Sequence, residues 1–295
     1  MRPEHFTKDR VMTTESQTSD TAGLTLVIGG TGKTGRRVVE RLQARHLPVR
    51  IGSRSAVPAF DWHNEASWDA SLTNVESIYI TYTPDLAIPG ATDAIRALVG
   101  KAKAQGVKRA VILSGRGEAE AQACEQIVME SGLEWTVVRA SWFNQNFSEG
   151  AFIEMVHAGE IALPAGDTPE PFVDVDDIAD VAVAALTEAG HHGEVYEVTG
   201  PRLMTFHDIA TELSRATGRE IRYTEIPHDA FIDAVAASGA PKDVVWIMDY
   251  LFTTVLDGHN AYLTDGVQRA LGRPPRDFAD YAKAVAASGA WEAAA

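Results

Sequence analysis

The stretch LTLVIGGTGKTGRRVVERL, from Leu24 to Leu42, decides the fold of this chain. It begins with an apolar run, Leu24–Ile28, which is short enough for a buried strand. Four glycines follow closely, and then apolar residues recur at helical spacing opposite a charged face. A strand, a glycine turn and a helix in that order predict a dinucleotide-binding unit.

The spacing of the glycines has a chemical reason. They fit both G-x-G-x-x-G and G-x-x-G-x-x-G, in which glycine permits a tight turn, close approach of a pyrophosphate and packing of the helix on the strand. The phosphates would contact free N–H groups at the helix start. A nucleotide-triphosphate P-loop is disfavoured, because Val27 stands where that motif requires glycine. The residues expected to bind the cofactor here are Gly29, Gly30, Thr31, Gly32, Lys33, Thr34 and Gly35.

Composition narrows the class of protein. The chain has 295 residues and a net charge of −15, which argues against binding to nucleic acid or to an anionic membrane. The single cysteine, Cys124, permits no internal disulfide and fits a reducing cytoplasm. No apolar run approaches the length of a membrane span. Residues 1–22 are polar and lack the apolar centre of a secretory signal, so we expect a disordered tail.

The end of the second predicted strand, Pro48–Ser53, bears on the choice of cofactor. Enzymes that use NAD place an acidic residue here for the ribose hydroxyls, whereas a cation suits the 2′-phosphate of NADP. This strand leads into Ser53 and Arg54, with no carboxylate. The planar guanidinium of Arg54 suits a phosphate dianion, which favours NADP(H) over NAD(H). The alternative is an exposed surface arginine.

Strands and helices alternate through the following residues. Further strands are expected at Ala59–Asp61, Ser77–Tyr82, Val107–Leu113 and Glu134–Arg139, with helices at Ala91–Gln105 and Glu118–Ser131. This alternation predicts an α/β fold with a doubly wound parallel sheet. Ligands bind at the carboxyl edge of such sheets, so Thr81, Tyr82 and Thr83 are placed at the site, the two threonines as cofactor contacts.

Four segments together resemble the NmrA-like, atypical branch of the short-chain dehydrogenase/reductases. They are GGTGKTG (Gly29–Gly35), SGLEWTVVRASWFNQNF (Ser131–Phe147), FVDVDDIADVAVAAL (Phe172–Leu186) and YEVTGPRLMTFHDIATEL (Tyr196–Leu213). The resemblance implies a Rossmann domain over residues 23–200 that binds NAD(P)(H). It also implies a smaller, interleaved α/β substrate domain over residues 201–295, to which residues 144–170 contribute.

The chain departs from the wider superfamily at its catalytic residues. Typical members use Ser, Tyr and Lys with a Tyr-x-x-x-Lys helix, but no tyrosine here has Lys four residues on. Ser114 matches the family serine, and the helix after it reads EAEAQACEQIVME. Ser114 and Tyr82 are therefore the catalytic candidates.

Three functions are compatible with the absence of that tyrosine. The first is an NADPH-dependent reductase of a hydrophobic imine, enone or ketone, for example in secondary metabolism. Such an enzyme could work without the tyrosine, because an iminium ion already carries positive charge and accepts hydride without a general acid. Ergot-alkaloid enzymes of the festuclavine dehydrogenase type carry a similar glycine turn and also lack the tyrosine. The second is a non-catalytic NADP(H)-binding redox sensor, and the third is an epimerase or rearrangement enzyme.

Aromatic and amide side chains mark the expected substrate side. In relatives the loop after the sixth predicted strand lies across nicotinamide and substrate, and packing between domains is the alternative. Val244–Val255 is apolar on most sides, which suits a pocket wall, core packing or the contact of a homodimer. The substrate candidates are Trp142, Phe143, Asn144, Asn146, Trp246 and Tyr250.

Other polar clusters are assigned mainly to the fold. Asp174, Asp176 and Asp177 are expected to cap a helix and orient loops, with catalysis as a weaker alternative. The histidines lack metal-binding spacing, so no metal is expected.

Overall fold

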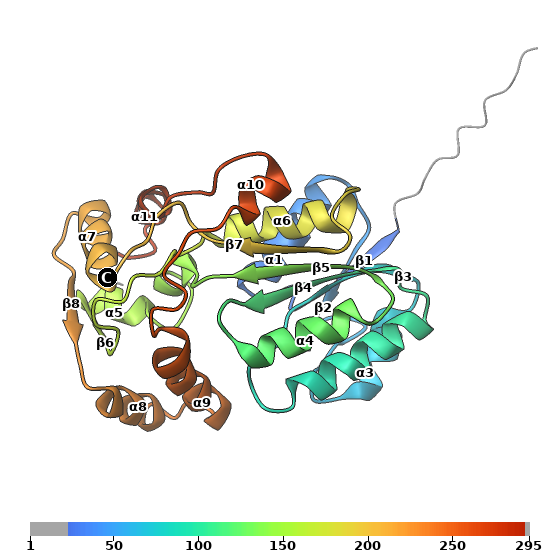
Figure 1. Cartoon of the computed structure of the whole chain (residues 1–295), viewed down its shortest axis with the longest axis horizontal. Helices are drawn as coiled ribbons and strands as arrows, with labels where there is room; N and C mark the ends of the chain where they lie inside the picture. Colours follow the sequence, from blue (N-terminus) through green and yellow to red (C-terminus); the bar gives the residue numbers. More distant parts are fainter. Residues whose placement is uncertain (1–22, 293–295) are drawn as a thin grey trace, which may run out of the picture.

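A computed structural model describes residues 23–292, and its centre is a six-stranded parallel sheet (Figure 1). The strand order is β2-β1-β3-β4-β5-β7. The strands are β1 (Leu24–Ile28), β2 (Val49–Gly52), β3 (Val75–Ile80), β4 (Arg109–Gly115), β5 (Glu134–Ala140) and β7 (Glu194–Val198). The chain runs from β1 to one side for β2 and to the other for β3, so their carboxyl ends form a crevice suited to a ligand. The expected tail, residues 1–22, lies outside the described residues.

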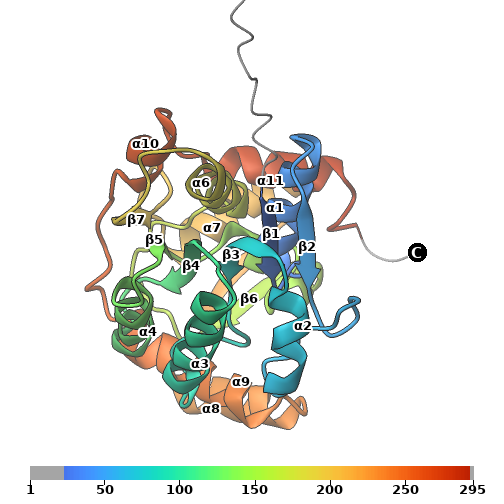
Figure 2. The same ribbon diagram turned by 90° about the vertical axis from the view of Figure 1, so that its right-hand side faces the viewer.

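Helices cover both faces of this sheet, as Figures 1 and 2 show. One face packs on α1 (Lys33–Ala44), α6 (Val175–Thr187) and α10 (Gly266–Leu271). The other packs on α2 (Trp68–Leu72), α3 (Ala91–Ala104) and α4 (Ala119–Met129), with the short η1 (Glu65–Ser67) before α2. The strands are buried on both faces and therefore read as continuous apolar runs. The predicted doubly wound α/β fold is confirmed.

A smaller unit lies beyond the carboxyl ends of the strands (Figure 1). It has a two-stranded parallel sheet of β6 (Glu160–Leu163) and β8 (Arg222–Glu225). Its helices are η2 (Asn144–Phe147), α5 (Ile153–Ala158), α7 (Phe206–Thr217), α8 (His228–Ala237), α9 (Lys242–Tyr250) and α11 (Phe278–Ala287). A separate core of aromatic side chains holds it, including Phe147, Phe206 and Phe278. The division into domains at residue 200 stays a prediction.

Two local expectations differ from the structure. The short strand predicted at Ala59–Asp61 is wrong, because these residues run as irregular chain over the sheet edge, where Trp68 Nε1 donates to the carbonyl of Asp61 at 2.7 Å. The helix expected over Val244–Val255 changes its hydrogen-bonding pattern part-way. The α-helix α9 ends at Tyr250, and a π-helical turn, η3 (Leu251–Val255), follows directly. Among residues 23–292, no helix is both long and apolar enough to cross a membrane.

Candidate active site

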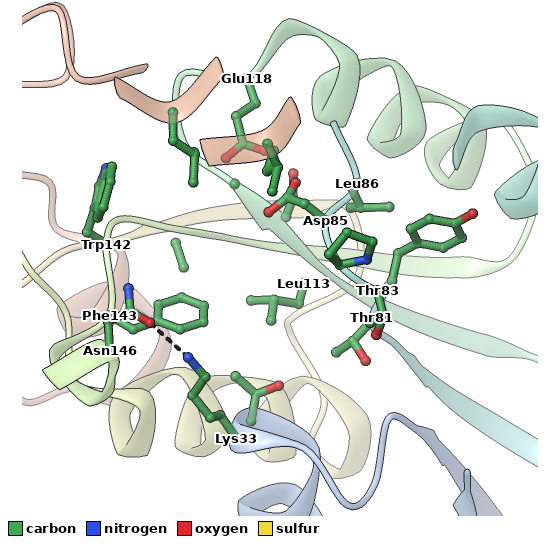
Figure 3. Close-up of a pocket in the computed structure, with 18 of the residues that line it drawn as sticks. Lys33, Thr81, Thr83, Asp85, Leu86, Leu113, Glu118, Trp142, Phe143 and Asn146 are labelled. Carbon is green, nitrogen blue, oxygen red and sulfur yellow. Dashed lines mark hydrogen bonds between the residues drawn. The ribbon is translucent and has the colours of Figure 1, made fainter. Parts of the chain in front are cut away.

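A cavity of about 400 Å³ opens where the two units meet, above the carboxyl ends of β1, β3, β4 and β5. The glycine turn and the start of α1 form one side, and α9 with η3 forms the opposite side. Figure 3 shows the side chains that converge on it from these elements. Segments far apart in the sequence therefore build a single site at the sheet edge expected to bind ligands.

The glycine turn leaves room beside the start of α1. Gly29 has a φ of +69°, which favours glycine, and a Cβ on Gly35 would lie 2.2 Å from the carbonyl oxygen of Gly29. Gly32 is the N-cap of α1, and the first turn carries no acidic residue. The first N–H groups of a helix have no intrahelical acceptor and attract anions, so this turn fits a dinucleotide pyrophosphate.

Of the residues predicted in this turn, four line the cavity: Gly29, Gly32, Lys33 and Thr34. Gly30, Thr31 and Gly35 are not among its lining residues. A Cβ on Gly35 would meet the main chain of the turn, and a Cβ on Gly30 would lie 3.0 Å from both the Ile51 side chain and the carbonyl oxygen of Val27. Their structural part is to let strand and helix approach closely.

Lys33 connects α1 to the loop after β5. Its Nζ donates a hydrogen bond to Asn146 Oδ1 at 2.8 Å (Figure 3). Burial lowers the pKa of Lys33, although the carboxylate of Glu149 opposes that shift. Glu149 itself bonds to Arg36 at 2.5 Å and to Arg37 at 2.7 Å. These contacts tie η2 and the residues directly after it to the start of α1.

The end of β2 lies beside the glycine turn. The N–H of Gly29 donates to the carbonyl of Gly52 at 2.9 Å, which places Ser53 and Arg54 next to the turn. Ser53 is partly exposed and its hydroxyl lies 3.3 Å from that of Ser55. Arg54 is exposed, and neither residue is among those that line the cavity.

Both catalytic candidates line the cavity, in different surroundings. Ser114 is 4% exposed, and its hydroxyl has no hydrogen-bond partner within residues 23–292. The Tyr82 ring packs against Trp62, with 4.7 Å between ring centroids, and burial raises the pKa of its phenol. Thr81 and Thr83 line the cavity beside it, and Thr81 Oγ1 donates to the carbonyl of Ile28 at 3.0 Å.

Three carboxyl groups that sequence reasoning did not single out also face the cavity: Asp85, Glu118 and Glu170. Glu170 is 1% exposed and accepts a hydrogen bond from Ser141 Oγ at 3.2 Å. Burial raises the pKa of Glu170 to about 7. No local motif surrounds these acids, so only their shared position at the sheet edge could have indicated them.

Most of the predicted substrate residues after β5 also meet here. Trp142, Phe143 and Asn146 line the cavity. Asn144 does not line it, since its side chain is fully buried and its two polar atoms find no partner in the described part of the chain. Its backbone N–H donates to Val173 at 2.9 Å, which anchors the loop.

Helix α9 turns a different face to the cavity than its aromatic residues suggest. From α9, the side chains that line the cavity are Val244, Ile247 and Met248, and η3 adds Leu251 and Val255. Trp246 and Tyr250 stack on each other with 5.2 Å between ring centroids and are not among the lining residues. Tyr250 donates to Glu120 at 2.6 Å, and Trp246 borders a shallow hollow facing α8.

The aspartates of the FVDVDDIAD segment serve the fold. Asp174 caps α6 by accepting from the N–H of Asp176 at 2.8 Å. Asp177 is fully buried and accepts from the backbone N–H of Arg276 at 2.7 Å. None of them lines the cavity. Over residues 23–292, no group of three potential metal ligands is present.

Comparison with known proteins identifies the family. The model of the NmrA-like family matches residues 21–281. The chain belongs to the NmrA-like family. It is 34% identical to the NAD(P)H azoreductase of Xenophilus azovorans, over 89% of this chain and 98% of that protein. It is 32% identical to agroclavine dehydrogenase of Claviceps fusiformis, over 87% and 95% of the two chains.

Solved structures support the fold of this NmrA-like chain. An NADPH-dependent quinone oxidoreductase from Escherichia coli, in complex with NADPH, superposes with a TM-score of 0.74. It is 21% identical and covers 89% of this chain and 99% of its own, a likeness that concerns the fold alone.

The helix that carries Tyr and Lys in typical relatives is α4 in this NmrA-like chain. It presents Cys124 to the core, where the thiol is fully buried and lies 3.8 Å from the carbonyl oxygen of Leu86. Burial raises the pKa of Cys124 to about 12, so its thiol stays protonated. The thiol therefore contributes to core packing, and Cys124 is not among the residues that line the cavity.

Proposed function

We propose that this protein is an NADPH-dependent reductase of a hydrophobic small molecule with a polar double bond, such as an imine, enone, ketone or azo compound. The coarser class, an NAD(P)H-dependent oxidoreductase, follows from its family and named relatives. The observation that carries the proposal is one cavity bounded by the glycine turn and by an apolar helix. When bound, the nicotinamide would supply hydride.

The chain's own residues would hold and orient the reactants. Gly29, Gly32 and the first N–H groups of α1 would bind the pyrophosphate, with Lys33 close by. Ser114 has an unpartnered hydroxyl available for a substrate or nicotinamide oxygen. Trp142 and Phe143 face the apolar side of α9, and such a wall excludes water from the reacting atoms.

Arg54 carries the proposed preference for NADP(H). We expect Arg54→Ala to raise the KM for NADPH about tenfold and to leave the KM for NADH nearly unchanged, because only NADPH has a 2′-phosphate for the guanidinium. Initial rates with both cofactors test this. Arg96→Ala removes an exposed arginine from α3 and is the control. Equal effects on both cofactors would contradict the role of Arg54.

The cavity face of α9 is proposed to contact substrate. Met248→Trp adds volume inside the cavity and should raise the KM for the acceptor several-fold without changing NADPH affinity. Val245→Trp adds a similar volume on the side facing α8 and is the matched control. Steady-state kinetics with fluorescence titration of NADPH separates the two effects. A larger effect of the Val245 change would show that substrate binds elsewhere.

The deciding experiment combines binding with turnover. Titration should show that the protein binds NADPH more tightly than NADH, and a panel of imines, enones, quinones, ketones and azo dyes should include acceptors that oxidise it. NADPH binding without turnover on any acceptor would favour the redox-sensor alternative. Product formed without net NADPH consumption would favour the epimerase alternative.

A further inference from the structure

Two carboxyl groups meet inside the cavity, on segments that the sequence keeps far apart. Asp85 follows β3, and Glu118 immediately precedes α4. Figure 3 shows both side chains reaching into the same part of the cavity, with their carboxyl groups toward each other. Asp85 Oδ1 accepts from the N–H of Ala87 at 2.9 Å, which fixes its orientation.

Glu118 is held over the end of β4 without a conventional partner. It is 4% exposed, and a Cβ on Gly115 would lie 2.2 Å from its Oε1. Although Glu118 is the N-cap residue of α4, its side chain makes no capping hydrogen bond. Within residues 23–292, Glu118 Oε2 finds no N–H or O–H donor. A proton shared with Asp85 is the arrangement that satisfies this oxygen.

We propose that Glu118, paired with Asp85, is the proton donor of this site and replaces the tyrosine that the chain lacks. The inference rests on the proposed reductase function. Glu118 lies at the end of β4, close to Ser114 and opposite the apolar face of α9. A neutral carboxylic acid in this position can donate a hydrogen bond or a proton to an acceptor in the cavity.

The charges around the pair keep one proton on it. Burial raises the pKa of Glu118 well above its ordinary value of 4.5, and the Asp85 carboxylate raises it further. Burial likewise raises the pKa of Asp85. Glu120 and Glu125 on α4 raise the pKa of Glu118 as well, and the neighbouring Tyr250 and Cys124 are neutral. The cationic groups nearby have other partners: Arg116 donates to the carbonyls of Asn260 and Tyr262, Arg139 pairs with Glu125, Arg96 with Asp93 and His259 with Asp257. Burial and the repulsion between two adjacent carboxylates act in the same direction and favour a proton held by the pair.

The proposed step balances in atoms and electrons. NADPH gives hydride, and thus two electrons, to one end of the acceptor double bond and becomes NADP⁺. The O–H bond of Glu118 breaks, and its proton forms a new bond at the other end of the acceptor. The carboxylate left behind regains a proton from solvent water by way of Asp85. An iminium ion takes hydride without this proton, whereas an azo bond needs it.

The protonated carboxyl group can be detected without cofactor. Infrared difference spectra of wild type minus Glu118→Gln, at neutral pH, should show the C=O stretch of a protonated carboxyl group. Glu120→Gln, which removes an exposed carboxylate nearby, should leave that band intact. A wild-type protein from which Glu118→Gln removes no such band would overturn the proposal. A band that remains in Glu118→Gln and disappears in Glu170→Gln belongs to the other buried acid.

Stability gives a second cofactor-free measurement. A carboxyl group whose pKa is raised by folding stabilises the protein below its ordinary pKa, and this stability is lost as pH rises through the folded pKa. The Tm of Glu118→Gln should therefore match wild type at low pH and exceed it increasingly as the pH rises above the ordinary value of 4.5. A difference in Tm independent of pH would count against a retained proton.

Turnover then assigns the chemistry. With the azo dye methyl red, Glu118→Gln should lower kcat/KM about a hundredfold. With the iminium salt N-methyl-3,4-dihydroisoquinolinium, the kcat/KM of Glu118→Gln should stay close to that of Glu120→Gln. Loss of azo reduction in Glu170→Gln instead of Glu118→Gln would give the role to the other buried acid. Failure of wild type to bind NADPH would refute the proposed function itself, and the infrared result would still stand.

Discussion

Gly32→Val is expected to weaken NADPH binding about a hundredfold while leaving the fold intact. Gly32 has φ −84° and ψ −179°, an extended conformation that valine adopts readily, so the substitution causes little backbone strain. Its side chain would project beside the first N–H groups of α1, where the pyrophosphate is proposed to bind. Losing these charged hydrogen bonds costs about 3 kcal/mol, or about a hundredfold in Kd.

Fluorescence titration with NADPH measures this effect, and circular dichroism with a melting curve confirms folding. Gly32→Ala should give an intermediate loss, since its Cβ would lie 3.2 Å from the carbonyl oxygen of Gly29. Gly100→Val, in open space on α3, is the control for adding valine elsewhere. Unchanged NADPH affinity in folded Gly32→Val would remove the phosphate-binding role of the turn, and with it the proposed function.

Asp177→Ala is expected to destabilise the protein strongly. The buried carboxylate of Asp177 accepts from the N–H of Arg276, pairs with that guanidinium and with Arg273 at 2.8 Å, and so ties α6 to the segment before α11. Its removal leaves the backbone N–H of Arg276 without its acceptor, and it leaves Asp180 as the remaining partner of both arginines. Breaking such a pair costs about 3 kcal/mol, which for a chain of this size lowers Tm by about 5 °C.

The neighbouring aspartate is the control for Asp177. The side chain of Asp176 is 36% exposed and pairs with Arg41 at 2.6 Å. Solvent screens such a pair, so Asp176→Ala should cost less than about 1 kcal/mol. Denaturant unfolding of both variants provides the comparison. A similar loss in both, or a loss of NADPH turnover in Asp177→Ala under conditions where it is fully folded, would contradict a purely structural role.

The sequence predicted best where a short segment contains its own physical reason. The glycine turn could be predicted because the close contact that requires Gly35 is made within the turn, against Gly29. The alternation of strands and helices likewise predicted the sheet, since the central strands β1 and β3 are largely apolar on both faces. The strand expected at Ala59–Asp61 failed because apolar residues in a loop over the sheet edge resemble a short strand.

The face of α9 could not be predicted, for a related reason. Its residues are apolar on most sides, so helical periodicity does not select one face. The structure turns Ile247 and Met248 to the cavity and leaves Trp246 outside it. The two aromatic side chains of α9 instead stack on each other, and Tyr250 is held by its hydrogen bond to Glu120 on α4.

The sequence by itself determined the family, the doubly wound sheet and the glycine turn between β1 and α1, because each is encoded in neighbouring residues or in a regular pattern. Only the tertiary structure brought Asp85 and Glu118 together and left one oxygen without a donor. Their pairing depends on the neighbouring positions of β3 and β4 in the sheet and on the burial of both loops. Proximity and desolvation change the properties of a carboxyl group, and both arise only when the chain folds.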